Sequence, residues 1–107
     1  MSGYATRGAY VRARPIAVVQ DLRELKGPAS GAVRLPRRLD WSPDPEYDLA
    51  DPEQVVWMYS YVLGAALRED DLREFIDSRT LRQLWPVLSL APQVREAWES
   101  RFPELVS

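Results

Sequence analysis

The sequence predicts an all-α fold, in which a small bundle of three to four short helices follows an extended, basic N-terminal arm. Two observations predict the bundle: a capped stretch with helical spacing of its apolar residues at 51–67, and shorter stretches of the same kind before residue 105. A third predicts the arm, because Pro36, Pro43 and Pro45 exclude a central strand and favour polyproline or edge geometry. At 107 residues, the chain holds one domain at most.

Residues 1–15 are expected to be a disordered tail. They carry three arginines and no acidic residue, and no helical or strand periodicity is present. The alternative is an arm that follows phosphate groups while Tyr4 and Tyr10 stack on nucleic-acid bases.

Residues 16–50 are predicted to form the extended arm, with one short helix in it. The apolar segment at 16–19 is either a short strand or a hydrophobic anchor. Asp21 and Glu24 match a capping box and predict a helix near 22–26. Such an arm needs a surface to lie on, which is either its own helical module or a partner protein, with nucleic acid as a weaker third choice.

Residues 51–105 are predicted to form the helical module, whose longest helix covers 51–67. Its start is marked by Asp51 at the N-cap, Pro52 at the first helical position and Gln54 at the third. At about 100° per residue, one stripe holds five apolar side chains: Val55, Tyr59, Val62, Leu63 and Ala66. Since the opposite side is also largely apolar, this helix needs a cover on a second side.

Three shorter helices are predicted after it, each with a capping residue or a proline at its ends. They are expected at 72–77 after a capping box of Asp71 and Glu74, at 79–85 after Ser78 or Thr80, and from Pro92 to Phe102 before Pro103. We expect Trp85 and Trp98 in the core, and Trp41 in the core or docking the arm. A module of this size buries only about 60% of the surface its unfolded chain exposes, so a partner or self-association would stabilise it.

Composition excludes several classes of function. Without cysteine and histidine, the chain has no disulfide, no Cys/His zinc site and no Cys or His nucleophile. No glycine-rich phosphate loop is present, and the acidic stretch at 44–53 lacks the glycine and the terminal glutamate of a calcium loop. We therefore expect no enzyme, no cofactor and no metal. The apolar runs fall short of the ~18 residues of a membrane span, which predicts a cytoplasmic protein without membrane contact.

Charge is divided unevenly along the chain. Residues 1–43 hold eight basic and three acidic residues, a net charge of +5, and residues 44–107 hold six and thirteen, a net charge of −7. The two parts sum to the overall −2. A basic arm is therefore attached to an acidic module.

Trp57 and Tyr61 are the strongest candidates for a binding site. They lie four residues apart on the side of the 51–67 helix that faces away from its apolar stripe. Aromatic side chains are enriched at the centres of protein interfaces. We expect either a partner protein or the chain's own arm to cover them, and Arg37, Arg38 and Trp41 of the arm are predicted to contribute to partner binding.

A second candidate site is for nucleic acid. The helices at 72–77 and 79–85 resemble a helix-turn-helix in outline, and the second would present Arg79, Arg82 and Gln83 to a groove. Five acidic residues between 69 and 77 oppose this, because a duplex repels an acidic face. Nucleic-acid binding is therefore the less favoured prediction.

The C-terminal two thirds also resemble a known group of proteins. The phrases that carry the resemblance are LPRRLDW, YDLADPEQVVWMYSYVLGAAL and DDLREFIDSRTLRQLWPVLSLAPQVREAWESRFPEL. Over residues 35–105 the chain is similar to small actinobacterial antitoxins that accompany nucleotidyltransferase-like toxins. This resemblance implies a cognate toxin-like enzyme as partner, which transfers nucleotides to tRNA ends and needs a positive cleft, and an antitoxin without catalytic residues that blocks it sterically.

Two alternatives from other classes stay open. One is a small DNA-binding transcriptional regulator that uses the arm and the helix pair. The other is a homodimeric accessory or structural subunit, in which the helix at 51–67 pairs with its own copy.

Overall fold

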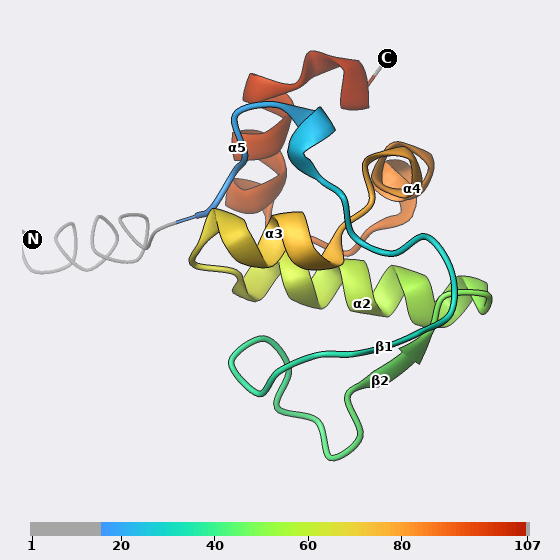
Figure 1. Cartoon of the computed structure of the whole chain (residues 1–107). Helices are drawn as coiled ribbons and strands as arrows, with labels where there is room; N and C mark the ends of the chain where they lie inside the picture. Colours follow the sequence, from blue (N-terminus) through green and yellow to red (C-terminus); the bar gives the residue numbers. More distant parts are fainter. Residues whose placement is uncertain (1–15, 107) are drawn as a thin grey trace, which may run out of the picture.

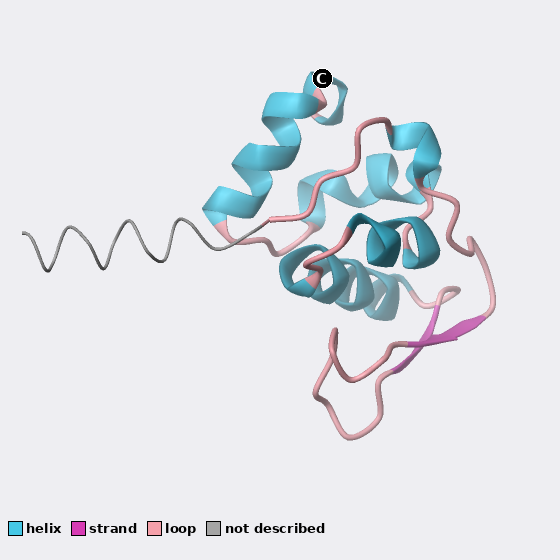
Figure 2. Ribbon diagram, turned by 60° about the vertical axis from the view of Figure 1, so that its left-hand side comes forward, coloured by secondary structure: helices cyan, strands magenta, loops and turns pink. Residues whose placement is uncertain are grey.

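The computed structural model describes residues 16–106, so the predicted tail at 1–15, with Tyr4 and Tyr10, lies outside the described residues. Figure 1 labels the main elements, and Figure 2 shows the same fold from a second side. In chain order these are the 3₁₀ helix η1 (Leu22–Glu24), strands β1 (Ala32–Arg34) and β2 (Glu46–Asp48), helices α2 (Pro52–Ala65), α3 (Glu69–Phe75) and α4 (Ser78–Leu84), η2 (Trp85–Val87), α5 (Pro92–Arg101) and η3 (Pro103–Leu105).

The prediction of an all-α fold was wrong, because β1 and β2 form a two-stranded antiparallel sheet beside α2. Val33 pairs with Tyr47 at its centre, and both of these side chains are buried while their neighbours in each strand are exposed. The prolines do not interrupt the sheet, because each of them lies outside the strands. Pro45 contributes only its carbonyl oxygen, which accepts a hydrogen bond from the Leu35 amide. The fold is mostly helical with a small sheet.

The arm lies on its own module. Leu22, Leu25, Val33, Leu35 and Leu39 belong to the same buried cluster as the inward residues of α2, α3, α4 and α5. The segment at 16–19 is the predicted hydrophobic anchor rather than a strand, since Val19 is fully buried. Residues 16–50 therefore share one core with the helices that follow.

One glycine lets the arm approach the helices closely. Lys26 and Asp77 form an isolated antiparallel bridge, and the Gly27 amide donates to the Ile76 carbonyl at 2.9 Å. A Cβ at Gly27 would lie 2.5 Å from the backbone of Ile76 and Phe75, so any larger residue would push the arm away.

Helix α2 has the predicted start and ends two residues earlier than predicted. The Asp51 carboxylate accepts from the amides of Glu53 at 2.9 Å and Gln54 at 3.4 Å. Gln54 does not complete a capping box, since its side-chain oxygen accepts from the Asp48 amide instead. This bond ties β2 to the first turn of α2.

The predicted start of α3 was wrong. Asp71 is not an N-cap but lies inside the helix, where its buried side chain accepts from Arg38 of the arm. The predicted cap of the next helix was also wrong, because Asp77 caps α4 and accepts from the Thr80 amide at 3.0 Å. Helix α5 begins at Pro92 as predicted and ends before η3.

Two tryptophans form the centre of the C-terminal core, as predicted. Trp85 and Trp98 are 1% and 0% exposed, and their ring centroids are 6.3 Å apart. The Arg95 guanidinium lies 5.0 Å from the Trp85 ring centroid, and Glu99 accepts from the Trp85 indole at 2.9 Å. The expectation that Trp41 lies in the core or docks the arm was wrong, since this side chain is 80% exposed.

Candidate interaction surface

The outward side of α2 is a stripe without charge over most of its length. Trp57 and Tyr61 are 54% and 49% exposed, and the exposed Gly64 follows them on the same side. Between Glu53 and Arg68 the sequence contains no charged residue. We call Trp57, Tyr61 and Gly64 the aromatic stripe.

The aromatic stripe has a boundary on each side. Tyr47 of β2 packs against Tyr61 with ring centroids 6.3 Å apart. On the other side, the Ser60 hydroxyl accepts from the Ser89 amide at 3.1 Å, which holds the segment after η2 against α2. The arm therefore touches only the edge of the stripe and leaves its centre open to solvent.

The loop between β1 and β2, residues 35–45, is held by a buried carboxylate. Asp40 accepts hydrogen bonds from the Tyr47 hydroxyl, the Ser42 hydroxyl and the Ser42 amide, the last at 2.9 Å. Burial alone would raise the pKa of Asp40, but the hydrogen bonds from Ser42 and Tyr47 outweigh it and lower this pKa. Burial, together with the bond to Asp40, raises the pKa of Tyr47 to about 12. The loop is thus fastened to β2.

Trp41 is displayed by this fastened loop. It lies between Asp40 and Ser42, which bond to one another, while its own side chain is 80% exposed. The Arg37 guanidinium lies 5.7 Å from the Trp41 ring centroid, within the range of a cation–π contact. The backbone of the loop therefore holds an exposed Trp–Arg pair.

Arg38, the neighbour of Arg37, serves a different purpose. Its guanidinium donates to the Asp71 carboxylate at 2.7 Å, and this hydrogen bond raises the pKa of Arg38. The Asp71 side chain is only 3% exposed, and the Arg38 side chain is 50% exposed. Arg38 therefore fixes the loop on α3, and its predicted contact with a partner would use only its exposed half.

The predicted nucleic-acid residues occur together but away from this loop. Arg79, Arg82 and Gln83 are all exposed on α4, which lies above α2 in Figure 1 while the β1–β2 loop lies below it. Arg82 is 3.9 Å from Glu104, so an acidic side chain lies beside this surface. The structure thus presents two separate candidate surfaces.

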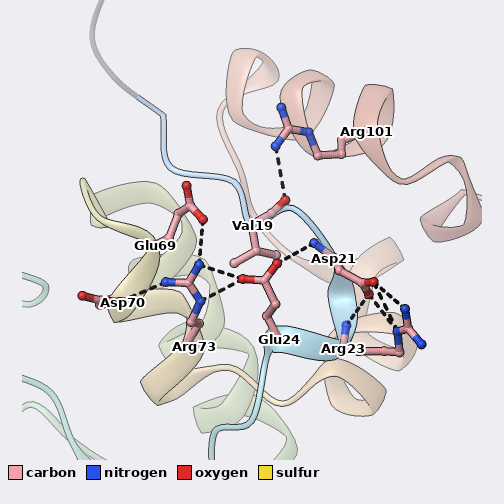
Figure 3. A network of polar contacts seen from close by, with 8 residues as sticks. All are labelled: Val19, Asp21, Arg23, Glu24, Glu69, Asp70, Arg73 and Arg101. Atoms are coloured by element: carbon pink, nitrogen blue, oxygen red, sulfur yellow. Dashed lines mark hydrogen bonds and ion pairs between the residues drawn. The ribbon is translucent and has the colours of Figure 1, made fainter.

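Sequence reasoning missed the polar network around Arg73, which Figure 3 shows. This guanidinium lies 2.7 Å from Glu24 of η1 and 2.9 Å from both Glu69 and Asp70. It joins the arm to α3, and nothing local in the sequence indicates this, since Glu24 is 49 residues away.

An open groove of about 780 Å³ lies next to this network, between the 16–20 segment, α3 and α5. Its arginines have internal contacts: Arg73 has three carboxylates, Arg68 is 3.6 Å from Asp71, and Arg101 donates to the Val19 carbonyl at 3.3 Å. We therefore infer that the arginines lining this groove hold the arm in place. Within residues 16–106, no group of three or more acidic side chains is placed to hold a metal ion, and no helix there is long and apolar enough to cross a membrane.

Comparisons of the chain with protein-family models, with curated proteins and with solved structures found no match. The resemblance to antitoxins over residues 35–105 therefore stays a prediction. Any proposal about function depends on the aromatic stripe, the β1–β2 loop and the charge around them.

Proposed function

We propose that this chain is a non-catalytic protein-binding antitoxin that neutralises a nucleotidyltransferase-like toxin by steric occlusion. The observation that carries the proposal is the presence of three exposed aromatic side chains, Trp41, Trp57 and Tyr61, on backbone that hydrogen bonds and aromatic packing hold in place. Exposed aromatic rings on a rigid support provide large contact area at a low cost in conformational entropy.

Charge supports the choice of partner. Residues 44–107 carry a net charge of −7, and exposed acidic side chains lie on the β1–β2 loop, on β2, in the first turn of α2 and on α3. These include Asp44, Glu46, Asp48, Glu53 and Asp70. An enzyme that acts on tRNA needs a positive cleft, and complementary charge would steer this acidic surface towards such a cleft and favour its occlusion.

The experiment is co-expression of the tagged full-length chain with its neighbouring reading frames, followed by measurement of the mass of the purified complex and of growth rescue. We expect a stoichiometric complex with a toxic enzyme. The double variant Trp57→Glu and Tyr61→Glu should lose binding and rescue together, because it places two charges in an apolar contact.

The matched control is Val87→Glu, because Val87 is 62% exposed but lies on η2, outside the stripe. It should bind and rescue as the unchanged chain does. If the chain is purified without a partner, or if the double variant still rescues growth, the proposal is wrong.

A second candidate function is DNA binding through α4, which the joint exposure of Arg79, Arg82 and Gln83 favours. It predicts salt-dependent binding of the isolated chain to duplex DNA, measured by fluorescence anisotropy. Replacing Arg79 and Arg82 by Gln should then weaken binding to any sequence by a similar factor.

A further inference from the structure

The aromatic stripe contains one large exposed side chain, Trp57, and one position without a side chain, Gly64. Trp57 is 54% exposed, and Gly64 lies seven residues further along the same side of α2. Seven residues are two helical turns, so the two positions are about 10 Å apart along the axis. A Cβ at Gly64 would have no heavy atom within 4 Å, so the surface there is open.

We propose that α2 pairs antiparallel with α2 of a second copy of this chain when no other partner is bound. A twofold axis between Ser60 and Tyr61 places Trp57 of each copy over Gly64 of the other, and brings the two Tyr61 side chains together. The same two positions then meet twice, as a twofold interface requires. Gly64 allows the close approach, because it presents only backbone to the incoming indole ring.

Charge at the ends of the stripe favours this orientation. Exposed Glu53 lies at the beginning of α2, and exposed Arg68 follows its end as the N-cap of α3. Antiparallel pairing keeps the two Glu53 side chains at opposite ends of the contact, whereas parallel pairing would place these like charges side by side. Since the sequence contains no charged residue between Glu53 and Arg68, α2 itself brings no charge into the centre of the contact.

The contact is narrow, because Tyr47 and the segment at Ser89 flank the stripe. A single helix pair is at the small end of specific interfaces, so we expect a dimer that dissociates in the micromolar range. A protein that binds the aromatic stripe would have to displace the second copy. This competition rests on the proposed function, whereas the self-pairing does not.

Sedimentation velocity of the full chain alone, from about 1 to 500 µM, tests the pairing. We expect a monomer–dimer equilibrium, and Gly64→Gln and Trp57→Ala should each raise its dissociation constant at least ~10-fold. Gly64→Gln should keep the fold, because the added side chain points into open space. Val87→Ala, which removes exposed apolar surface elsewhere, should leave the equilibrium unchanged.

Cross-linking tests the orientation, because the chain contains no cysteine. Under mild oxidation Tyr61→Cys should give a covalent dimer, since the two positions meet at the axis within disulfide reach. Glu53→Cys should not, because the two copies of position 53 lie at opposite ends of the contact.

A chain that stays monomeric throughout, a dimer that Gly64→Gln leaves intact, or cross-linking of Glu53→Cys would each overturn the pairing. Because the chain is tested alone, these outcomes do not bear on toxin binding. Failure of the proposed function would appear instead as a dimer that binds no partner from the neighbouring reading frames.

Discussion

Tryptophan is used in opposite ways in two regions of this chain. In the C-terminal core, Trp98 is fully buried between Trp85 and Phe102, with ring centroids 6.3 and 5.9 Å away. In the β1–β2 loop, Trp41 is 80% exposed, and it is the neighbouring Asp40 that is buried. In the core, the buried aromatic ring packs against its neighbours and stabilises the fold. In the loop, a hydrogen-bonded backbone holds an exposed aromatic ring in position.

The largest effect is expected for truncation of the buried ring, and truncation of the exposed ring is its control. Trp98→Ala should lower the free energy of unfolding by about 3–5 kcal/mol, because it leaves a large cavity. Trp41→Ala should change it by less than about 0.5 kcal/mol, as expected for an exposed side chain. Urea denaturation followed by circular dichroism measures both values, and similar losses in the two variants would contradict the comparison.

A smaller effect tests what holds the loop. Asp40→Asn should cost about 1.5–3 kcal/mol near pH 7, because an amide cannot accept all the hydrogen bonds that the carboxylate accepts. The sign of its pH dependence is fixed by the lowered pKa of Asp40. This carboxylate stabilises the fold above its ordinary pKa of 3.8, and the contribution disappears as the pH falls below that value.

The midpoint temperature of unfolding should therefore decrease less steeply as the pH is lowered from about 6 to about 3 in Asp40→Asn than in the unchanged chain. Asp44→Asn is the matched control, since Asp44 is in the same loop with its side chain 79% exposed. It should keep the original pH dependence. An acid response that is the same in all three proteins would mean that Asp40 does not fasten the loop.

The smallest effect concerns the attachment of the loop to α3. Asp71→Asn should cost about 1–2 kcal/mol, at the low end for a charged hydrogen bond because the Arg38 side chain is half exposed. Its neighbour Asp70, with a side chain 79% exposed, provides the control, and Asp70→Asn should have an effect below about 0.5 kcal/mol. If urea denaturation gave equal losses in the free energy of unfolding for the two variants, the Arg38–Asp71 pair would not hold the loop on α3.

Where a capping residue or a proline marks the start of a helix, the sequence predicted that start correctly for α2 and α5. The start of α2 follows from Asp51 and Pro52, and that of α5 from Pro92, because capping residues and prolines act within one turn. The burial of Trp85 and Trp98 followed from helical spacing in the same way.

What the sequence did not predict depends on distant contacts. Strands β1 and β2 have three residues each and one buried side chain each, which is too short for an alternating pattern to be recognised. Asp71 has the spacing of a cap, but Arg38, 33 residues earlier, pairs with it inside α3. Of the candidate surface, Trp57 and Tyr61 were predicted to face outward, whereas the exposure of Trp41 depends on the buried Asp40 beside it.

The long reach of the arm also sets an order for biosynthesis. The Val19 carbonyl accepts from Arg101, and Lys26 forms a backbone bridge with Asp77, so the segment that leaves the ribosome earlier is held by segments that leave it later. The arm cannot dock before α4 and α5 have been translated. Its apolar side chains, and the backbone at Gly27, therefore stay exposed in the nascent chain until the residues up to Arg101 have left the ribosome.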